Sequence, residues 1–216
     1  MCGRFTLINW QEMAERFGVS VAIDFIPRYN ITPTQQIPVI VNIKRPEIRL
    51  FRWGLIPSWV KDTDNWPLLI NAKAETITKK KSFCNSFKYR RCLIPADGFY
   101  EWKREGKKKI PYRFSLKNKS LFAFAGLWDY CETEKGKLYT CTIITTGANE
   151  LVAEFHNRMP VILKKDAEAK WLDVSSQQTD ALKELLLPYP AAEMEVAAVN
   201  PLVNKATIDS PEILST

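Results

Sequence analysis

The residue with the most distinctive potential chemistry is Cys2, because it stands one position from the start of the chain. If Met1 is removed, Cys2 carries a free α-amine and a thiol on adjacent carbon atoms. Such a 1,2-aminothiol condenses with an aldehyde to an imine, and its thiol then closes a thiazolidine ring. The pKa of an α-amine is about 7.7–8.0 and that of a thiol about 8.5, so modest tuning makes each a nucleophile at neutral pH. Judged by position alone, Cys2 has a plainer explanation that stays open: small residues at position 2 commonly accompany removal of Met1.

The other cysteines give no sign of a metal site. The chain has five cysteines, no CxxC pair and one histidine, so no zinc-ligand spacing is present, and we expect no metal and no cofactor. Cys92, Cys131 and Cys141 lie in apolar runs typical of strands and are expected to be reduced core residues.

Charge indicates a polyanionic partner. The net charge is +7, but the first 163 residues carry +11 and residues 164–216 carry −4. Nucleic acid is favoured over a membrane surface because the sequence contains no basic amphipathic helix. A solvated, lysine-rich surface explains the charge equally well.

Composition excludes several classes of protein. With 46% hydrophobic residues, seven Trp, seven Tyr and eleven Phe, the chain has too much apolar area to be disordered. No run approaches the roughly 18 apolar residues of a membrane span. The N-terminal MCGRFTLINW does not resemble a signal peptide, so we expect a cytoplasmic protein.

The elements that must position these residues are mainly strands. Asn9 is predicted to cap a helix that carries Trp10, Met13 and Phe17 and ends at Gly18. IPVIVNI and IRLFRW, joined by a turn at 44–47, predict a hairpin. The remaining expected elements are helical pieces in 71–91, strands RCLIPADGFYEWK, PYRFSL, LFAFAGLWDY, LYTCTIITT and MPVIL, helices at 149–155, 167–172 and 180–187, and a strand MEVAAVN.

Consecutive strands without regular strand–helix alternation predict the fold class. No repeat, low-complexity segment or long linker divides the chain. We therefore expect residues 1–216 to form a single α+β domain on a largely antiparallel, barrel-like sheet with short flanking helices.

Five segments in order, MCGRF, WGLIPSW, INAKAET, IPADGFYEW and FHNRMPVIL, resemble the SRAP family of SOS-response-associated peptidases or abasic-site-processing proteins. The resemblance extends from residue 1 to about residue 163. It implies a protein that removes Met1 autocatalytically and shields abasic sites in single-stranded DNA by a thiazolidine crosslink through Cys2. It also implies possible lyase-type chemistry.

The resemblance assigns the remaining catalytic roles residue by residue. Asn71, in INAKAET, would orient the amine or stabilise a developing oxyanion. Glu101, in GFYEW, would transfer protons during imine formation, and its aromatic neighbours suit a raised pKa. His156, in FHNRMP, would protonate the sugar ring oxygen as the ring opens, or hold the thiol and amine in reactive form.

Without the resemblance, each of these three residues has a plainer explanation. Asn71 precedes a possible helix and would cap it, Glu101 on an alternating strand would face solvent, and His156 would be a hydrogen-bonded spectator.

Residues in the same segments are candidates for binding DNA. Arg4 and Arg158 offer fork-like donors for phosphate, while Pro33 and Trp59 match positions that pack on bases or sugars. Core burial of Trp59 is an equal alternative. Lys73 and Lys81 stand where the family commonly has arginine, so they keep the charge and lose bidentate geometry. Lys107–Lys109 predict a solvated hairpin turn.

The sequence thus predicts a protein, expected to be a monomer, whose partner is single-stranded DNA containing abasic sites, with no membrane partner. Two alternatives are a cysteine peptidase acting on other proteins and a non-covalent single-strand-binding module. A peptidase substrate groove has no signature here, and the basic bias favours DNA.

Overall fold

Strands form most of the framework of this computed structural model, which describes residues 2–20, 25–175 and 179–215. The strands are β1 (Phe5–Leu7), β2 (Arg28–Ile31), β3 (Gln36–Asn42), β4 (Pro46–Trp53), β5 (Asn71–Lys73), β6 (Arg91–Ala96), β7 (Gly98–Glu105), β8 (Lys108–Leu116), β9 (Phe122–Thr133), β10 (Gly136–Gly147), β11 (Arg158–Pro160), β12 (Ile162–Leu163) and β13 (Met194–Ala198). The α-helices are short: α1 (Met13–Phe17), α2 (Cys84–Tyr89), α3 (Glu150–Ala153), α4 (Lys165–Leu172) and α5 (Thr179–Lys183). Single 3-10 turns are η1 (Trp10–Glu12), η2 (Ala74–Thr76), η3 (Ala191–Glu193), η4 (Pro201–Asn204) and η5 (Pro211–Leu214).

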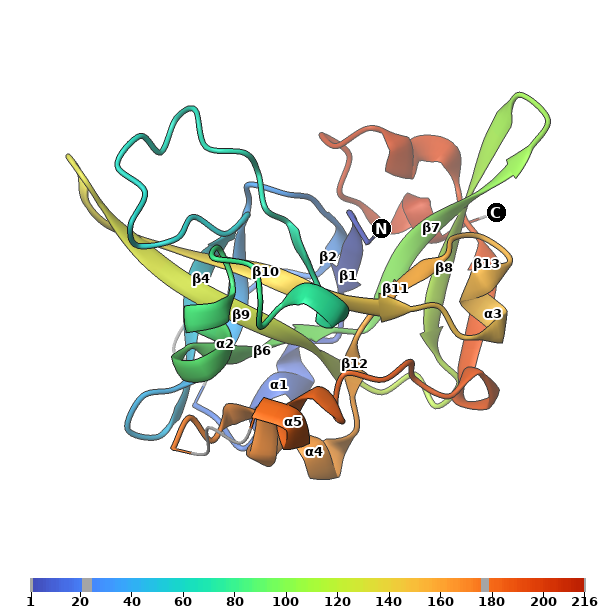
Figure 1. Ribbon diagram of the computed structural model, residues 1–216. Coiled ribbons are helices and arrows are strands. Elements are labelled where there is room, and N and C mark those ends of the chain that lie inside the picture. Colours follow the sequence, from blue (N-terminus) through green and yellow to red (C-terminus); the bar gives the residue numbers. More distant parts are fainter. Residues whose placement is uncertain (1, 21–24, 176–178, 216) are drawn as a thin grey trace.

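The larger sheet closes into a barrel. Its order β10-β4-β3-β6-β9 returns to the first strand because β9 also pairs with β10. All of these pairs are antiparallel except β4 with β10, and β5 adds a second parallel partner to β10. Helices α4 and α5 lie together below the barrel (Figure 1). The predicted fold class, α+β on a largely antiparallel, barrel-like sheet with short flanking helices, is confirmed.

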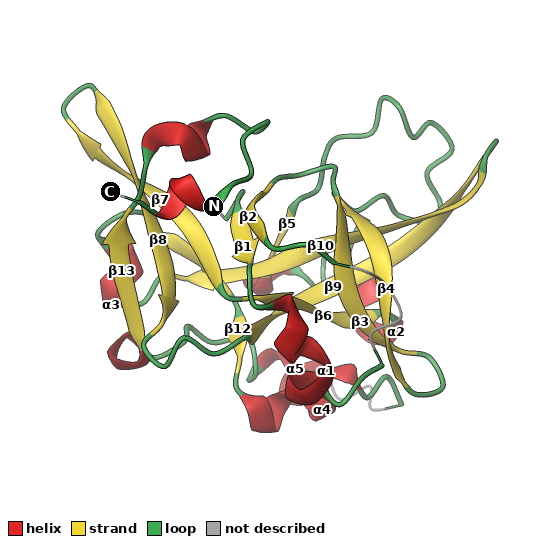
Figure 2. Ribbon diagram, turned by 180° about the vertical axis from the view of Figure 1, so that it is seen from behind, coloured by secondary structure: helices red, strands yellow, loops and turns green. Residues whose placement is uncertain are grey.

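A second antiparallel sheet, in the order β13-β8-β7-β1-β2, stands beside the barrel. Its β7–β8 hairpin projects from the body of the molecule, and the C-terminal turns lie next to the start of β1 (Figures 1 and 2). Of the expected turn at Lys107–Lys109, only Lys107 lies in the turn, beside Gly106 with its φ of 60°, whereas Lys108 and Lys109 are exposed residues of β8 because they pair with β7.

The segment expected to form one strand, residues 91–103, forms two. β6 joins the barrel and β7 joins the second sheet, with the chain changing sheets at Asp97. The buried Asp97 carboxylate accepts hydrogen bonds from the backbone of Ile8 and Asn9, and it also pairs with Arg113 at 2.9 Å. These contacts tie the two sheets together where the strands separate.

The N-terminal helix has the predicted end and a different beginning. Gly18 ends it in the left-handed region at φ 63°, and its N–H donates to the carbonyl of Ala14. Asn9 does not cap it, because the Asn9 side chain makes no capping hydrogen bond and its backbone N–H donates to Asp97. The hairpin β3–β4, the helix capped by Asn149 and the strand β13 are confirmed.

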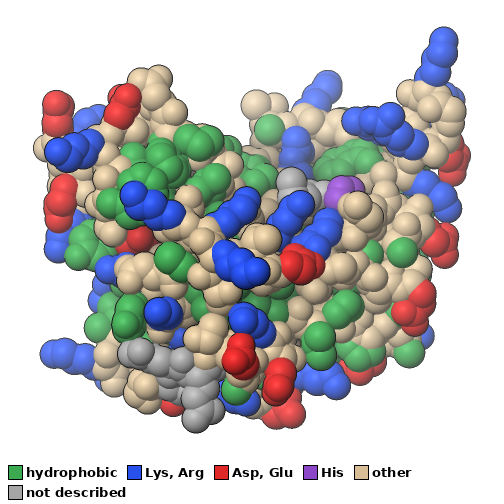
Figure 3. Space-filling view, viewed as in Figure 1, with side chains coloured by type: hydrophobic (Ala, Val, Ile, Leu, Met, Phe, Trp, Pro, Cys, Tyr) green, Lys and Arg blue, Asp and Glu red, His purple; other side chains and the backbone are tan. Residues whose placement is uncertain are grey.

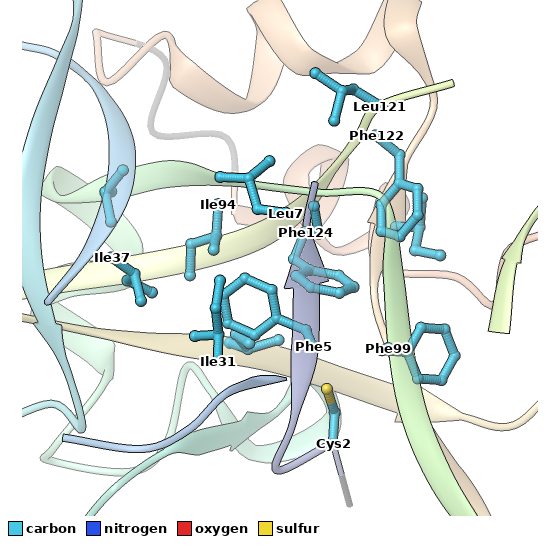
Figure 4. Packing of buried hydrophobic residues seen from close by; sticks show 14 of the residues in the cluster. Cys2, Phe5, Leu7, Ile31, Ile37, Ile94, Phe99, Leu121, Phe122 and Phe124 are labelled. Carbon is cyan, nitrogen blue, oxygen red and sulfur yellow. The ribbon is translucent and has the colours of Figure 1, made fainter. Parts of the chain in front are cut away.

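Aromatic and aliphatic side chains from both sheets fill one core (Figure 4). Phe5 packs edge-on against Trp53 and Phe124, with ring centroids 5.3 and 5.7 Å apart. Cys92, Cys131 and Cys141 are buried in the core clusters as free thiols, as predicted. No helix among the described residues is long and apolar enough to cross a membrane.

Candidate active site

Strand pairing in the second sheet places Cys2 alongside Glu101. β1 pairs Phe5 with Phe99, and the ladder continues as the Tyr100 N–H donates to the Arg4 carbonyl at 3.0 Å. The residues preceding Arg4 therefore lead toward Glu101, beyond the last described pairing with β7. The Cys2 side chain is fully buried, with its sulfur turned toward the core cluster in Figure 4 and 3.8 Å from the Arg4 carbonyl oxygen.

Asn71 holds the backbone of Cys2 from the other side. It lies on β5, opposite Ile143 of β10, and its Nδ2 donates to the carbonyl oxygen of Cys2 at 2.9 Å. Its buried Oδ1 has no hydrogen-bond partner among the described residues. The alternative in which Asn71 caps a helix is wrong, because η2 begins after Lys73 and Asn71 lies in a strand.

Glu101 is a buried carboxyl group next to the cysteine. It lies on β7 opposite Tyr112 and is 4% exposed, which excludes the solvent-facing alternative. Burial raises the pKa of Glu101. Burial also raises the pKa of the Cys2 thiol, and the negative charge of Glu101 adds to that increase.

His156 is held in one orientation by its own segment. Its backbone N–H donates to the Val152 carbonyl at 3.0 Å, and its Nδ1 accepts the Arg158 N–H at 2.9 Å. Burial lowers the pKa of His156, which favours the neutral ring. Because Nδ1 is an acceptor, the neutral ring carries its proton on Nε2.

Glu101 and His156 line the same open pocket, which has a volume of about 700 Å³. The remaining lining residues are Trp102, Lys103, Arg104, Lys109, Glu154, Phe155 and Asn204. The site is built between the two sheets. The second sheet supplies Cys2 and Glu101, while β10 brings in Asn71 through β5 and the His156 segment through β11.

This arrangement can transfer protons beside a nucleophile. A carboxyl group with a raised pKa can act as an acid, and a neutral imidazole can act as a base or hydrogen-bond donor. Asn71 supplies a fixed, non-titrating amide. Among the described residues, no group of three His, Cys, Asp or Glu side chains is placed to hold a metal ion.

Arg4 lies near the site, and its donors are largely engaged within the protein. Its guanidinium donates to Asn30 Oδ1 at 3.0 Å, to the Val203 carbonyl and to the Asn204 carbonyl at 3.3 Å. Arg4 thus fastens the C-terminal turns to the start of β1. Its binding to DNA stays a prediction.

Arg158 is engaged in a similar way. Its two terminal nitrogens bind the carboxylate of Glu75 at 2.5 and 3.0 Å, and one of them also donates to the Thr145 carbonyl at 2.6 Å. The Arg158 hydrogen bond lowers the pKa of Glu75. A phosphate bound by Arg158 has to compete with this carboxylate.

The other four DNA candidates are accessible. Trp59 is 45% exposed, which excludes core burial, and Lys81 places its Nζ 4.5 Å from the centre of the Trp59 ring. Lys73 is also exposed, and Pro33 is half-buried. Figure 3 shows Lys and Arg side chains in a band across this face, ending beside the only histidine. Binding of DNA by these residues stays a prediction.

Sequence reasoning missed several residues at the site. Asn204 lines the pocket and accepts a hydrogen bond from Trp102 Nε1 at 2.8 Å, although it lies far along the chain in η4. Glu75 is part of INAKAET and was available as a partner for Arg158. Trp66 stands edge-on to Trp59 at 5.1 Å. Only Glu75 had a signal in the sequence, because the other contacts depend on folding.

Comparisons with known proteins identify relatives of this chain in sequence and in fold. The abasic site processing protein YoqW of Bacillus subtilis (strain 168) is 45% identical over 223 residues, covering all of both chains. The abasic site processing protein HMCES of Xenopus tropicalis is 32% identical, covering 88% of this chain and 66% of its own length. A crystal structure of a protein from Bacteroides thetaiotaomicron superimposes with a TM-score of 0.90 at 29% identity, covering 99% of each chain.

The resemblance carried by the five sequence segments is confirmed by a family match over residues 1–206, described as SOS response associated peptidase (SRAP). Together with relatives that match from end to end, this match shows that the chain belongs to the SRAP family.

Proposed function

We propose that this protein binds single-stranded DNA containing abasic sites and, once Met1 has been removed, bonds covalently to the lesion through Cys2. The observation that carries the proposal is the convergence of Asn71, Glu101 and His156, from three distant segments, around the N-terminal cysteine. The printed names of the relatives, abasic site processing proteins, support the choice of substrate.

The covalent step is balanced with no further reactant. The α-amine of Cys2 attacks the C1′ aldehyde of the ring-opened sugar, and loss of one water gives an imine. The thiol sulfur then bonds to C1′ while its proton passes to the nitrogen, which gives a thiazolidine. If the imine does not close, the neighbouring C2′–H becomes acidic, and elimination of the 3′ phosphate gives lyase-type strand cleavage.

Glu101 is suited to the proton transfers of imine formation. The carbinolamine must lose its hydroxyl as water, so it needs a nearby acid, and the incoming amine must lose a proton. A carboxyl group whose pKa is raised by burial can be protonated for the first role and ionised for the second.

His156 and Asn71 complete the site. With its proton on Nε2, neutral His156 can donate a hydrogen bond to the sugar ring oxygen and stabilise the negative charge that develops there as the ring opens to the aldehyde. Asn71 fixes the position of Cys2 through the carbonyl oxygen of that residue. We propose that the same groups assist removal of Met1, because amide hydrolysis at Cys2 needs the same acid and base.

The reactive form of Cys2 requires a change from the structure described here. The thiol is fully buried and faces the core, so the residue must turn toward the pocket after Met1 is removed. Removing Met1 converts the Cys2 amide nitrogen into an amine and frees that end of the chain to turn.

The preference for a single strand rests on the accessible Trp59, which can stack on an unpaired base, and on the basic band. A monomeric state and a cytoplasmic location are further predictions.

A peptidase acting on other proteins is disfavoured by the basic excess of the first 163 residues, because that charge suits a polyanionic partner rather than a polypeptide chain. The non-covalent module differs from the proposal only in bond formation.

One gel distinguishes the three functions. Protein lacking Met1 is incubated with a single-stranded abasic oligonucleotide and then denatured. A shifted band is the result expected for covalent chemistry. Native binding without a denaturation-resistant band would indicate a non-covalent module, and absence of both would leave the peptidase.

A further inference from the structure

The free edge of β7 forms one side of the active-site pocket. β1 covers β7 only as far as Tyr100, and from Glu101 onward the described residues of β7 pair with β8 alone. The consecutive residues 101–104 all line the pocket, although successive side chains of a strand point to opposite faces, so the pocket reaches around this edge. The pocket therefore continues from Glu101 outward along the β7–β8 hairpin.

Two cations face each other on this hairpin. Arg104 of β7 pairs directly with Lys109 of β8, and both line the pocket. Like charges directly opposite each other destabilise a sheet. Both side chains are exposed, and neither forms an ion pair with a residue that the structure describes. This pair of like charges therefore does not stabilise the folded hairpin.

The neighbouring positions behave differently. Glu105 and Lys108, the next pair along the hairpin, have opposite charges. Lys103, the preceding cation, lies 3.5 Å from a carboxylate oxygen of Glu154 and 5.2 Å from the centre of the Phe155 ring. Arg104 and Lys109 are thus the cations of this hairpin whose charge stays available to a ligand in the pocket.

We propose that Arg104 and Lys109 bind backbone phosphates of the DNA strand on one side of the lesion, which follows the hairpin away from Glu101. This inference rests on the proposed function and adds a binding site to it. Arg104 lies three steps along the strand from Glu101, or about 10 Å. A stacked strand rises about 3.4 Å per nucleotide, so the phosphates contacted lie about three nucleotides from the lesion.

The test uses neighbouring lysines as a matched pair. Lys109→Gln and Lys108→Gln each remove one positive charge from the start of β8, and of these two lysines only Lys109 lines the pocket. The probes are two oligonucleotides with a tetrahydrofuran abasic analogue, one extended by four nucleotides on its 5′ side and the other on its 3′ side. We expect Lys109→Gln to weaken binding of one probe by about two- to five-fold and to leave the other unchanged. Lys108→Gln should bind both like the wild type.

A fold defect is separated from a binding defect by Lys109→Glu. This variant places an acid opposite Arg104, so it should melt at or above the wild-type temperature while binding the affected probe still more weakly. Equal losses for Lys109→Gln and Lys108→Gln, equal losses on both probes, or no loss would overturn the inference. Failure of the proposed function is distinct, because the wild-type protein would then form no crosslink with any abasic oligonucleotide.

Discussion

Glu101 is a carboxyl group that folding removes from water, and this burial has consequences for both reactivity and stability. Its pKa is raised by burial, and its charge raises the pKa of the Cys2 thiol. A raised pKa makes the protonated carboxyl group available as an acid at higher pH than in an exposed glutamate. The same burial means that ionising Glu101 destabilises the folded state.

The first prediction concerns rate. Glu101→Gln keeps the shape of the side chain and cannot titrate, so crosslinking should slow by about 10²–10⁴-fold. Non-covalent binding to an abasic analogue should change little. Glu105→Gln, on the same strand and exposed, is the control and should react like the wild type. Wild-type crosslinking rates for Glu101→Gln, measured in single-turnover gels, would show that Glu101 is structural.

The second prediction concerns pH. A raised pKa in the folded state means that stability is greatest below the ordinary pKa of glutamate and is lost as pH rises through the raised value. Glutamine mimics the protonated form at every pH. Thermal melts of Glu101→Gln and the wild type should therefore coincide near pH 4 and diverge by pH 8, with the variant more stable. A melting temperature of the wild type that increases relative to that of Glu101→Gln as pH rises would refute this prediction.

At the scale of elements, the site depends on the place where the chain passes from β6 to β7. Asp97 binds the backbone of Ile8 and Asn9 and the side chains of Thr6 and Arg113. It thereby fixes β1, and with it Cys2, against β7. The sequence predicted one long strand here, because the apolar pattern hardly changes across Asp97 and only the tertiary hydrogen bonds divide it.

The third prediction follows from this cluster. Asp97→Ala leaves the guanidinium of Arg113 without its buried partner and should lower the free energy of unfolding by about 3–5 kcal/mol in urea titrations. Asp180→Ala, which removes an exposed carboxylate paired with Lys183, should change it little. Similar losses in both variants would mean that Asp97 does not hold the sheets together.

Local signals predicted local structure well. Alternating strands joined by a short polar turn predicted β3–β4, and Gly18 and Asn149 marked a helix end and a helix start. Local signals could not predict the contact of Asn71 with Cys2. That contact depends on the parallel pairing of β5 with β10, which joins segments far apart in the sequence. Motif resemblance named the site residues, whereas their convergence between two sheets required the structure.

At the scale of the whole molecule, basic side chains lie on the face that carries the candidate active site. The first 163 residues carry the basic excess, and Figure 3 shows Lys and Arg side chains in a band that ends beside the histidine. Two of the predicted phosphate ligands, Arg4 and Arg158, already have partners inside the protein. The exposed lysines are therefore expected to dominate the electrostatic attraction to DNA.

The fourth prediction is a salt dependence. With three to five phosphates neutralised, the logarithm of affinity for a single strand should fall with the logarithm of salt with a slope of about −2 to −3.5. Lys81→Ala should flatten this slope by about 0.7, and Arg4→Ala and Arg158→Ala by less. Lys108→Ala is the control and should leave it unchanged. Fluorescence anisotropy showing no salt dependence would argue against phosphate binding.

The central claim, covalent capture of an abasic site by a 1,2-aminothiol at Cys2, is tested most directly by intact mass spectrometry of the product. We expect the wild-type adduct to survive heating and to have the combined mass of oligonucleotide and protein lacking Met1, less one water. Cys2→Ser should give an adduct only after borohydride reduction, whereas Cys84→Ser, at a half-buried cysteine on α2, should react like the wild type. An adduct that retains Met1, or a heat-stable unreduced adduct of Cys2→Ser, would contradict the account.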